Sequence, residues 1–190
     1  MTSAPEPKRG QVIFLNGATS SGKTSIAEVL LDILDRPFFH LPVDAINGMR
    51  ARRELPPEQL EQVLERTVLG YHRAVAGMVA AGNDVVVDHV LRERTWLLDC
   101  LNLLAGGDVV LVGVHCSAEE LDLRERARGD RTPGRAAYHL ARVHEGVTYD
   151  VECDTTSTSP EGCAAQIMTH LARPAAGRAF DQMRARFLPA

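Results

Sequence analysis

Lysine is almost absent from this sequence. The 190 residues contain 21 basic side chains, but only two of these are lysines, at positions 8 and 23. Acidic residues outnumber basic ones and the net charge is -4, which disfavours polynucleotide partners because those need a basic surface. No apolar run approaches membrane-spanning length, and the polar first ten residues lack the apolar core of a signal peptide. We therefore expect a cytoplasmic protein that has no nucleic-acid or membrane partner.

Cysteine pairs with metal-site spacing are also missing. The four cysteines, at positions 100, 116, 153 and 163, form no CxxC pair, so we expect all four to be reduced and structural. His139 and His144 lie five residues apart without a cysteine pair beside them, which argues against a zinc site.

One segment near the N-terminus has the pattern of a phosphate-binding loop. An apolar run, Val12 to Leu15, precedes the glycine, lysine and threonine residues of a Gly-x4-Gly-Lys-Thr motif. In this arrangement a buried strand delivers the chain, backbone amides surround phosphate oxygens, and a helix starts with its positive end facing them. The lysine would then bridge the outer phosphates of ATP. The residues that we expect to bind the nucleotide are Gly17, Ala18, Thr19, Ser20, Ser21, Gly22, Lys23 and Thr24.

Two aspartates follow apolar segments further along the chain. Asp88 closes a β-branched run typical of a strand that is buried on both faces. It fits a magnesium site shared with the hydroxyl of Thr24, although it could instead contact the substrate or only cap the strand. Asp44 follows a short strand, Phe38 to Leu41, and is the candidate catalytic base for an acceptor hydroxyl. A purely structural role in a turn is the alternative for Asp44.

A basic cluster lies between residues 124 and 131, at Arg124, Arg126, Arg128 and Arg131. Planar guanidinium groups suit phosphate oxygens, and a mobile basic lid over the nucleotide would stabilise the transferring phosphoryl group and exclude water. We expect Arg124 to bind the nucleotide and Arg128 and Arg131, beside Gly129, to act catalytically together with Lys23. A solvent-exposed helix face with surface ion pairs is the alternative.

The order of the elements predicts an α/β fold. Strands are expected near 11–16, 38–41, 85–88, 109–114 and 147–153, with helices between them, including one long helix from about 57 to 81. This alternation predicts a three-layer sandwich with a central parallel sheet of about five strands. Ligands bind beyond the carboxyl ends of such strands, so Gly17, Asp44 and Asp88 should line one crevice.

The length suits one domain. We assign residues 10–173 to this domain, residues 1–9 to a flexible tail and residues 174–190 to a helical extension. The apolar stripe Phe180, Met183 and Phe187 predicts that the extension packs on the domain, and a homodimer contact is the alternative.

Several motifs in matching order resemble the chloramphenicol phosphotransferase family. They are Leu15-Asn16-Gly17-x4-Gly22-Lys23-Thr24, Val43-Asp44, Val87-Asp88, Ala127-Arg128-Gly129-Asp130-Arg131, and Val143-His144-Glu145-Gly146 followed by Tyr149-Asp150 and Asp154-Thr155-Thr156. The resemblance covers roughly residues 10 to 172. It implies a P-loop fold like that of nucleoside monophosphate kinases and ATP-dependent phosphorylation of a small-molecule hydroxyl, with Mg²⁺. In that family the aspartate that matches Asp44 acts as the base.

Between Asp44 and the long helix the chain departs from the family pattern, because it is short and rich in arginine. Arg50, Arg52 and Arg53 could favour an anionic or polar acceptor, although a solvated loop is the simpler interpretation.

Other P-loop classes lack their signatures here. With lysine only at positions 8 and 23 the chain has no Asn/Thr-Lys-x-Asp motif for guanine, and no Leu-Ser-Gly-Gly-Gln transporter signature occurs. The leading hypothesis is an O-phosphotransferase for a small hydroxyl compound such as an antibiotic. A metabolite or nucleoside kinase and a non-catalytic ATP-binding module are the alternatives.

Overall fold

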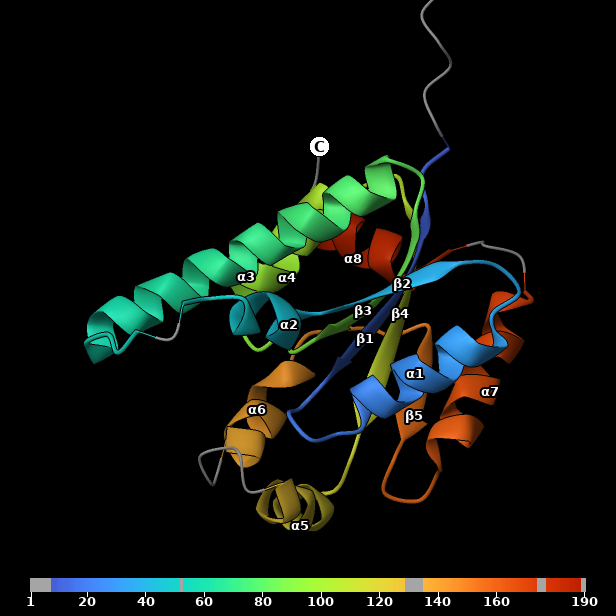
Figure 1. The fold of residues 1–190 in the computed structure, drawn as a ribbon. Coiled ribbons are helices and arrows are strands. Elements are labelled where there is room, and N and C mark those ends of the chain that lie inside the picture. The colour runs from blue at the N-terminus through green and yellow to red at the C-terminus, as the bar shows by residue number, and fades with distance from the viewer. Residues whose placement is uncertain (1–7, 52, 129–134, 174–176, 189–190) are drawn as a thin grey trace, which may run out of the picture.

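A parallel sheet of five strands forms the centre of the molecule. The computed structural model describes residues 8–51, 53–128, 135–173 and 177–188 (Figure 1). All neighbouring strands are parallel, in the order β2-β3-β1-β4-β5. The strands are β1 (Gln11–Gly17), β2 (Phe38–Pro42), β3 (Asp84–His89), β4 (Asp108–His115) and β5 (Val151–Asp154). This sheet confirms the predicted fold class.

Helices cover both faces of the sheet. Helices α3, α4 and α8 lie on one face and α1 and α7 on the other, while α5 and α6 lie near the carboxyl ends of the strands (Figure 1). Their bounds are α1 (Lys23–Ile33), α2 (Val43–Gly48), α3 (Pro57–Ala80), α4 (Arg94–Leu103), α5 (Ala118–Arg128), α6 (Arg135–Val143), α7 (Pro160–Leu171) and α8 (Ala179–Phe187).

The alternation of strand side chains explains why the central strands are apolar throughout. Phe14 of β1 packs into the core beneath α3 and α4, whereas its neighbours Ile13 and Leu15 pack beneath α1 and α7. All three side chains are buried. A strand with helices on both faces has no solvent side, so polar residues enter only at its ends.

Hydroxyl caps start two of the helices. The Ser117 hydroxyl accepts a hydrogen bond from the Glu120 amide at 3.2 Å, at the start of α5. The Ser159 hydroxyl accepts one from the Gly162 amide at 3.2 Å, at the start of α7. Each cap satisfies an amide that has no partner within its helix.

The last strand is shorter than the sequence predicts. Alternation suggested a strand over residues 147–153, but β5 begins only at Val151. The reason is Asp150, whose carboxylate accepts hydrogen bonds from the amides of Leu111 and Ala179, both at 2.8 Å. The Asp150 side chain thus takes the position of a strand partner and joins β4 to α8.

The C-terminal extension packs against the domain. Helix α8 buries Phe180 and Met183 in the core shared with α3 and α4, and Phe187 packs at its margin. The apolar stripe is therefore used within the chain. The homodimer alternative stays a prediction. Among the described residues, none of the helices combines the length and the apolar character that crossing a membrane requires.

Candidate active site

The phosphate-binding loop connects β1 to α1 at the carboxyl edge of the sheet. Gly22 precedes α1 with a φ of 91°, a left-handed conformation that glycine adopts without strain. Gly17 is fixed by close packing, because a Cβ there would lie 2.4 Å from the carbonyl oxygen of Val114. The loop therefore needs both glycines of the motif to take this path.

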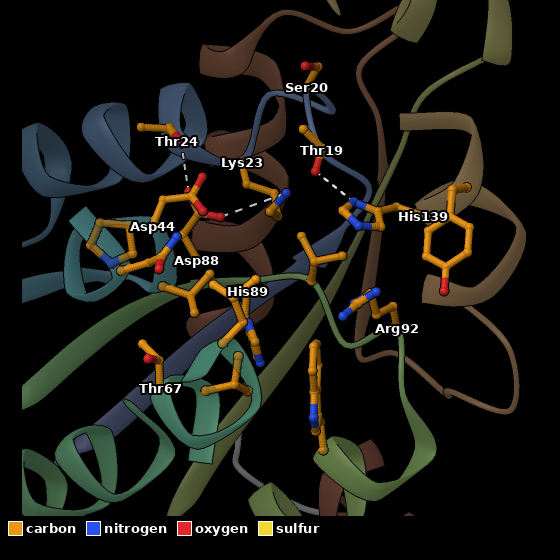
Figure 2. Close-up of a pocket in the computed structure, with 18 of the residues that line it drawn as sticks. Thr19, Ser20, Lys23, Thr24, Asp44, Thr67, Asp88, His89, Arg92 and His139 are labelled. Carbon is orange, nitrogen blue, oxygen red and sulfur yellow. Dashed lines mark hydrogen bonds and ion pairs between the residues drawn. The ribbon is translucent and has the colours of Figure 1, made fainter. Parts of the chain in front are cut away.

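Lys23, Thr24 and Asp88 meet beside the loop. The Thr24 hydroxyl donates to Asp88 Oδ2 at 2.7 Å, and Lys23 Nζ lies 3.7 Å from Asp88 Oδ1 (Figure 2). Lys23 is only 6% exposed and also donates to the carbonyl oxygens of Gly17 and Ala18. A hydroxyl and a carboxylate side by side are oxygen ligands of the kind that Mg²⁺ prefers, so Thr24 and Asp88 fit such an ion.

A cavity of about 320 Å³ opens next to this group; we call it the acceptor cavity. Asp44 and Asp88 both line it, and Figure 2 shows Asp44 on the same side as Lys23 and Thr24. The sequence analysis placed Asp44 directly after a strand. In the structure β2 ends at Pro42, and Asp44 lies in the first turn of α2. Gly17 itself does not line the cavity among the described residues. The predicted crevice thus brings the two aspartates together, although Asp44 comes from a helix.

The opposite wall of the acceptor cavity is largely apolar. The long helix α3 contributes one side of the wall, and α2, α4, α6 and the residue that follows β3 contribute the rest. The side chains that form this wall are Val43, Leu64, Val68, Val90, Trp96 and Tyr138. Arg92 lies over the rings of Trp96 and Tyr138, with its guanidinium carbon 4.8 and 5.8 Å from the two ring centres. The cavity therefore combines two carboxylates with an apolar, aromatic wall.

Sequence analysis missed a buried pair of histidines beneath this cavity. His89 follows Asp88 on β3, lines the cavity and is 1% exposed. Its Nε2 lies 3.0 Å from Nε2 of His72, whose Nδ1 lies 2.7 Å from Asp99 Oδ2. Burial lowers the pKa of His89 well below its usual value, and the neighbouring His72 adds to this effect. The signal in the sequence was a histidine directly after a strand-end aspartate.

His139 is a second cavity histidine whose position the sequence analysis did not predict. It was considered only as a metal ligand, but it is buried on α6, lines the acceptor cavity, and its Nδ1 lies 2.7 Å from the Thr19 hydroxyl of the loop. Helix α6 is thereby connected to the phosphate-binding loop.

Asn16, just before the loop, joins three further segments. Its amide donates to the Val143 carbonyl and to the Tyr149 hydroxyl, both at 2.8 Å, and its Oδ1 accepts from the Leu91 amide at 2.9 Å. Tyr149 also contacts His144 Nδ1 at 2.7 Å. The family motif around His144 and Tyr149 thus supports the strand that leads into the loop.

A second cavity, of about 550 Å³, lies on the other side of the loop; we call it the nucleotide cavity. Ser20 and Gly22 line both cavities, so the loop separates them. Arg124 lines the second one and donates to the hydroxyl and carbonyl oxygens of Thr155, at 3.2 and 2.8 Å. The nucleotide-binding role of Arg124 stays a prediction.

The other arginines differ in position. Arg126 is exposed and pairs with Asp122, as a surface ion pair does. Arg131 and the side chain of Arg128 lie outside the described residues, so their catalytic roles stay predictions. Arg50 and Arg53 do not line the acceptor cavity among the described residues, and Arg52 falls outside them.

Relatives with known structures share the fold of P-loop kinases. The APS kinase CysC of Mycobacterium tuberculosis, solved with AMPPNP and APS, superimposes with a TM-score of 0.68 at 16% identity, over 88% of this chain and 100% of that one. A gluconokinase of Sinorhizobium meliloti gives a TM-score of 0.61 at 18% identity, over 95% and 99%. The tunicamycin resistance protein of Deinococcus radiodurans gives 0.62 at 16%, over 87% and 98%. At these identities the likeness concerns the fold alone.

Sequence relatives are more specific. A protein of Mycobacterium tuberculosis that is provisionally named an O-phosphotransferase, from strains H37Rv and CDC 1551, is 31% identical over 216 residues, which cover 99% of this chain and 92% of the relative. Residues 10–172 match the family described as chloramphenicol phosphotransferase-like protein, the range that the motifs indicated. The chain therefore belongs to the chloramphenicol phosphotransferase-like family.

Proposed function

We propose that this protein transfers the γ-phosphoryl group of ATP to a hydroxyl group of a small molecule. The observation that carries the proposal is the position of the phosphate-binding loop between two cavities, with Lys23, Thr24 and Asp88 beside the loop in the wall of the acceptor cavity. A phosphotransferase needs a nucleotide site and an acceptor site that meet at the phosphates. The family, and the provisional name of its mycobacterial relative, support the same activity.

The loop and Arg124 would hold ATP. Backbone amides of the loop and the N-terminus of α1 favour the phosphates, and Lys23 supplies a charge for the outer ones. The nucleotide cavity, lined by Arg124 and Thr155, suits the rest of the nucleotide. Thr24 and Asp88 would hold Mg²⁺, which supplies charge stabilisation of the phosphates when bound.

Asp44 is proposed as the general base. The acceptor oxygen attacks the γ-phosphorus, a new O–P bond forms, the bond from the γ-phosphorus to the bridging oxygen breaks, and ADP leaves. The proton of the acceptor hydroxyl passes to the Asp44 carboxylate, which lines the acceptor cavity. Arg128 and Arg131 are proposed to stabilise the transferring phosphoryl group.

The acceptor is proposed to be a small hydroxyl compound with an apolar portion, since the acceptor cavity pairs carboxylates with the ring of Trp96. Hydroxylated antibiotics such as chloramphenicol fit this description, and so do some metabolites. A mass-spectrometric screen of the purified protein with ATP, Mg²⁺ and a panel of both classes tests the proposal. We expect a product that is heavier by one phosphoryl group.

Two variants make this screen decisive. Asp44→Asn should abolish the product and leave ATP binding largely unchanged, because the amide cannot accept the proton. Asp32→Asn, on the exposed face of α1, is the matched control and should behave like the wild type. Full activity of Asp44→Asn would disprove the base assignment. ATP binding without transfer to any compound would favour the non-catalytic alternative.

A further inference from the structure

A chain of three side chains runs from the surface of α4, through α3, to the acceptor cavity. Asp99 on α4 contacts His72 on α3 at 2.7 Å, and His72 contacts His89 at the end of β3 at 3.0 Å. Asp99 also forms an ion pair with Arg73, whose Nη1 lies 3.3 Å from Asp99 Oδ2. The reaction described above uses none of these residues.

The geometry fixes where the protons of both rings lie. A carboxylate can only accept, so Nδ1 of His72 carries a proton and donates to Asp99. A neutral imidazole carries only one N–H, so the Nε2 of a neutral His72 has no proton, and burial lowers the pKa of His72 and thereby favours this neutral form. The contact between the two rings then requires His89 Nε2 to donate. A neutral ring has one N–H only, so Nδ1 of His89 is left as a bare acceptor.

This Nδ1 atom belongs to a residue that lines the acceptor cavity. His89 lines the cavity, and Figure 2 shows it in the middle of the lining side chains. Its Nδ1 is buried and has no hydrogen-bond partner among the described residues. The ring stacks on Trp96 with centres 5.9 Å apart and packs edge-on against Tyr71, and a rotation would break the contact of its Nε2 with His72. A buried acceptor without a partner is unfavourable, and a donor on a ligand would satisfy it.

We propose that His89 is a specificity-determining residue that accepts a hydrogen bond from a second hydroxyl or N–H group of the acceptor molecule, and that Asp99 and His72 are positioning residues that keep its Nδ1 free of a proton. This inference rests on the proposed function and narrows its substrate class. The preferred acceptors carry a donor group close to the hydroxyl that is phosphorylated, as a diol does. A compound with a single hydroxyl leaves His89 unsatisfied.

The first test determines directly which ring nitrogens of His72 and His89 carry a proton. Protein labelled with ¹⁵N-histidine is measured by long-range ¹H–¹⁵N correlation NMR, with His72→Gln and His89→Gln used for assignment. We expect His72 to carry its proton on Nδ1 and His89 on Nε2. A proton on Nδ1 of His89 would overturn the proposal, because the ring would then offer a donor to the cavity.

The second test compares two probes that differ by one hydroxyl. The probes are 1-phenylethane-1,2-diol and 2-phenylethanol, whose ring suits the apolar wall. Their dissociation constants are measured by ligand-observed NMR on the full chain. One hydrogen bond corresponds to a preference of about five- to tenfold for the diol. Equal affinities, or no binding of either probe, would overturn the proposal.

Two variants distinguish the effect of losing the hydrogen bond at Nδ1 from the effect of losing the imidazole ring. In His89→Asn the amide oxygen takes the place of Nδ1, whereas in His89→Gln the amide reaches the place of Nε2 and leaves no polar atom at Nδ1. Both lose the stacking on Trp96. We expect the preference for the diol to persist in His89→Asn and to disappear in His89→Gln. The same preference in both variants would assign it to another residue.

Neither test needs turnover. Failure of phosphoryl transfer in the mass-spectrometric screen would therefore count against the proposed function, while the proton positions and the probe affinities would still decide the role of His89.

Discussion

Replacing Asn16 by alanine should destabilise the whole domain, although the residue makes no predicted contact with a substrate. Asn16 is completely buried and holds Leu91, Val143 and Tyr149 through three hydrogen bonds of 2.8–2.9 Å. These three residues belong to segments that are far apart in the sequence. Alanine removes every one of these bonds at once.

The size of the effect follows from what is left behind. The Leu91 amide and the Val143 carbonyl are backbone groups in buried residues, and each would lose this partner. A buried polar group without a partner costs about 1–3 kcal/mol. The Tyr149 hydroxyl keeps its contact with His144, so it adds little. We expect a loss of about 4 kcal/mol in the free energy of unfolding, a large part of the typical total of about 5–15 kcal/mol.

Urea denaturation followed by circular dichroism measures this loss. With a slope of about 2 kcal/mol per molar urea, the midpoint should fall by about 2 M. Tyr149→Phe removes the hydroxyl contacts with Asn16 and His144 and should cost about 2 kcal/mol, and the exposed Asn102→Ala should change stability by less than about 0.5 kcal/mol. If Asn16→Ala costs no more than Asn102→Ala, the role of Asn16 as a connection between segments is wrong.

Three further predictions concern the nucleotide site and acid stability. Lys23→Ala should weaken ATP binding about 10- to 100-fold, since a buried charge on the phosphates is lost; unchanged affinity in isothermal titration calorimetry would contradict the loop assignment. Arg124→Ala should weaken ATP binding about tenfold, whereas Arg126→Ala, whose side chain is 75% exposed, should not; equal effects in the same titration would exclude a specific role for Arg124. Burial lowers the pKa of His144 from 6.5 to about 4. Between these values the unfolded chain binds more protons than the folded one, so the free energy of unfolding falls as the pH is lowered through this interval. Urea titrations across it should show a smaller slope for His144→Gln than for the wild type, and an unchanged slope would show that His144 is not responsible.

The sequence predicted the sheet well because its strands are buried on both faces. Such strands appear as continuous apolar runs between turn residues, and the runs that end at Leu15 and Val87 correspond to β1 and β3. Helix α2 was missed, because six residues are too short for a helical period and it has no side-chain cap. The start of β5 was placed too early because the hydrogen bonds of Asp150 depend on a helix almost thirty residues later.

The site was predictable only where a motif fixes the spacing. Thr24 and Asp88 lie 64 positions apart, yet both follow strands whose carboxyl ends meet at one edge, so their contact was expected from topology. The contact of His72 with His89 was not expected. Hydrophobic periodicity shows that a helix has a buried face, but it does not show which strand residue lies beneath that face. For the same reason nothing in the sequence indicated that Trp96, which is buried on α4, lines the acceptor cavity.

The two cavities differ in how freely they can change during evolution. The nucleotide side depends on the backbone of one loop, where Gly17 and Gly22 tolerate no larger side chain. The acceptor side is built from side chains on α2, α3, α4 and α6 and from the end of β3 and the residues that follow it. Apart from His139, which contacts Thr19 of the loop, wall residues such as Leu64 and Tyr138 can therefore be substituted without disturbing the position of Lys23 or Asp88. For this reason the identity of the acceptor has to be argued from side chains such as His89 and Trp96, whereas the phosphoryl donor follows from the loop.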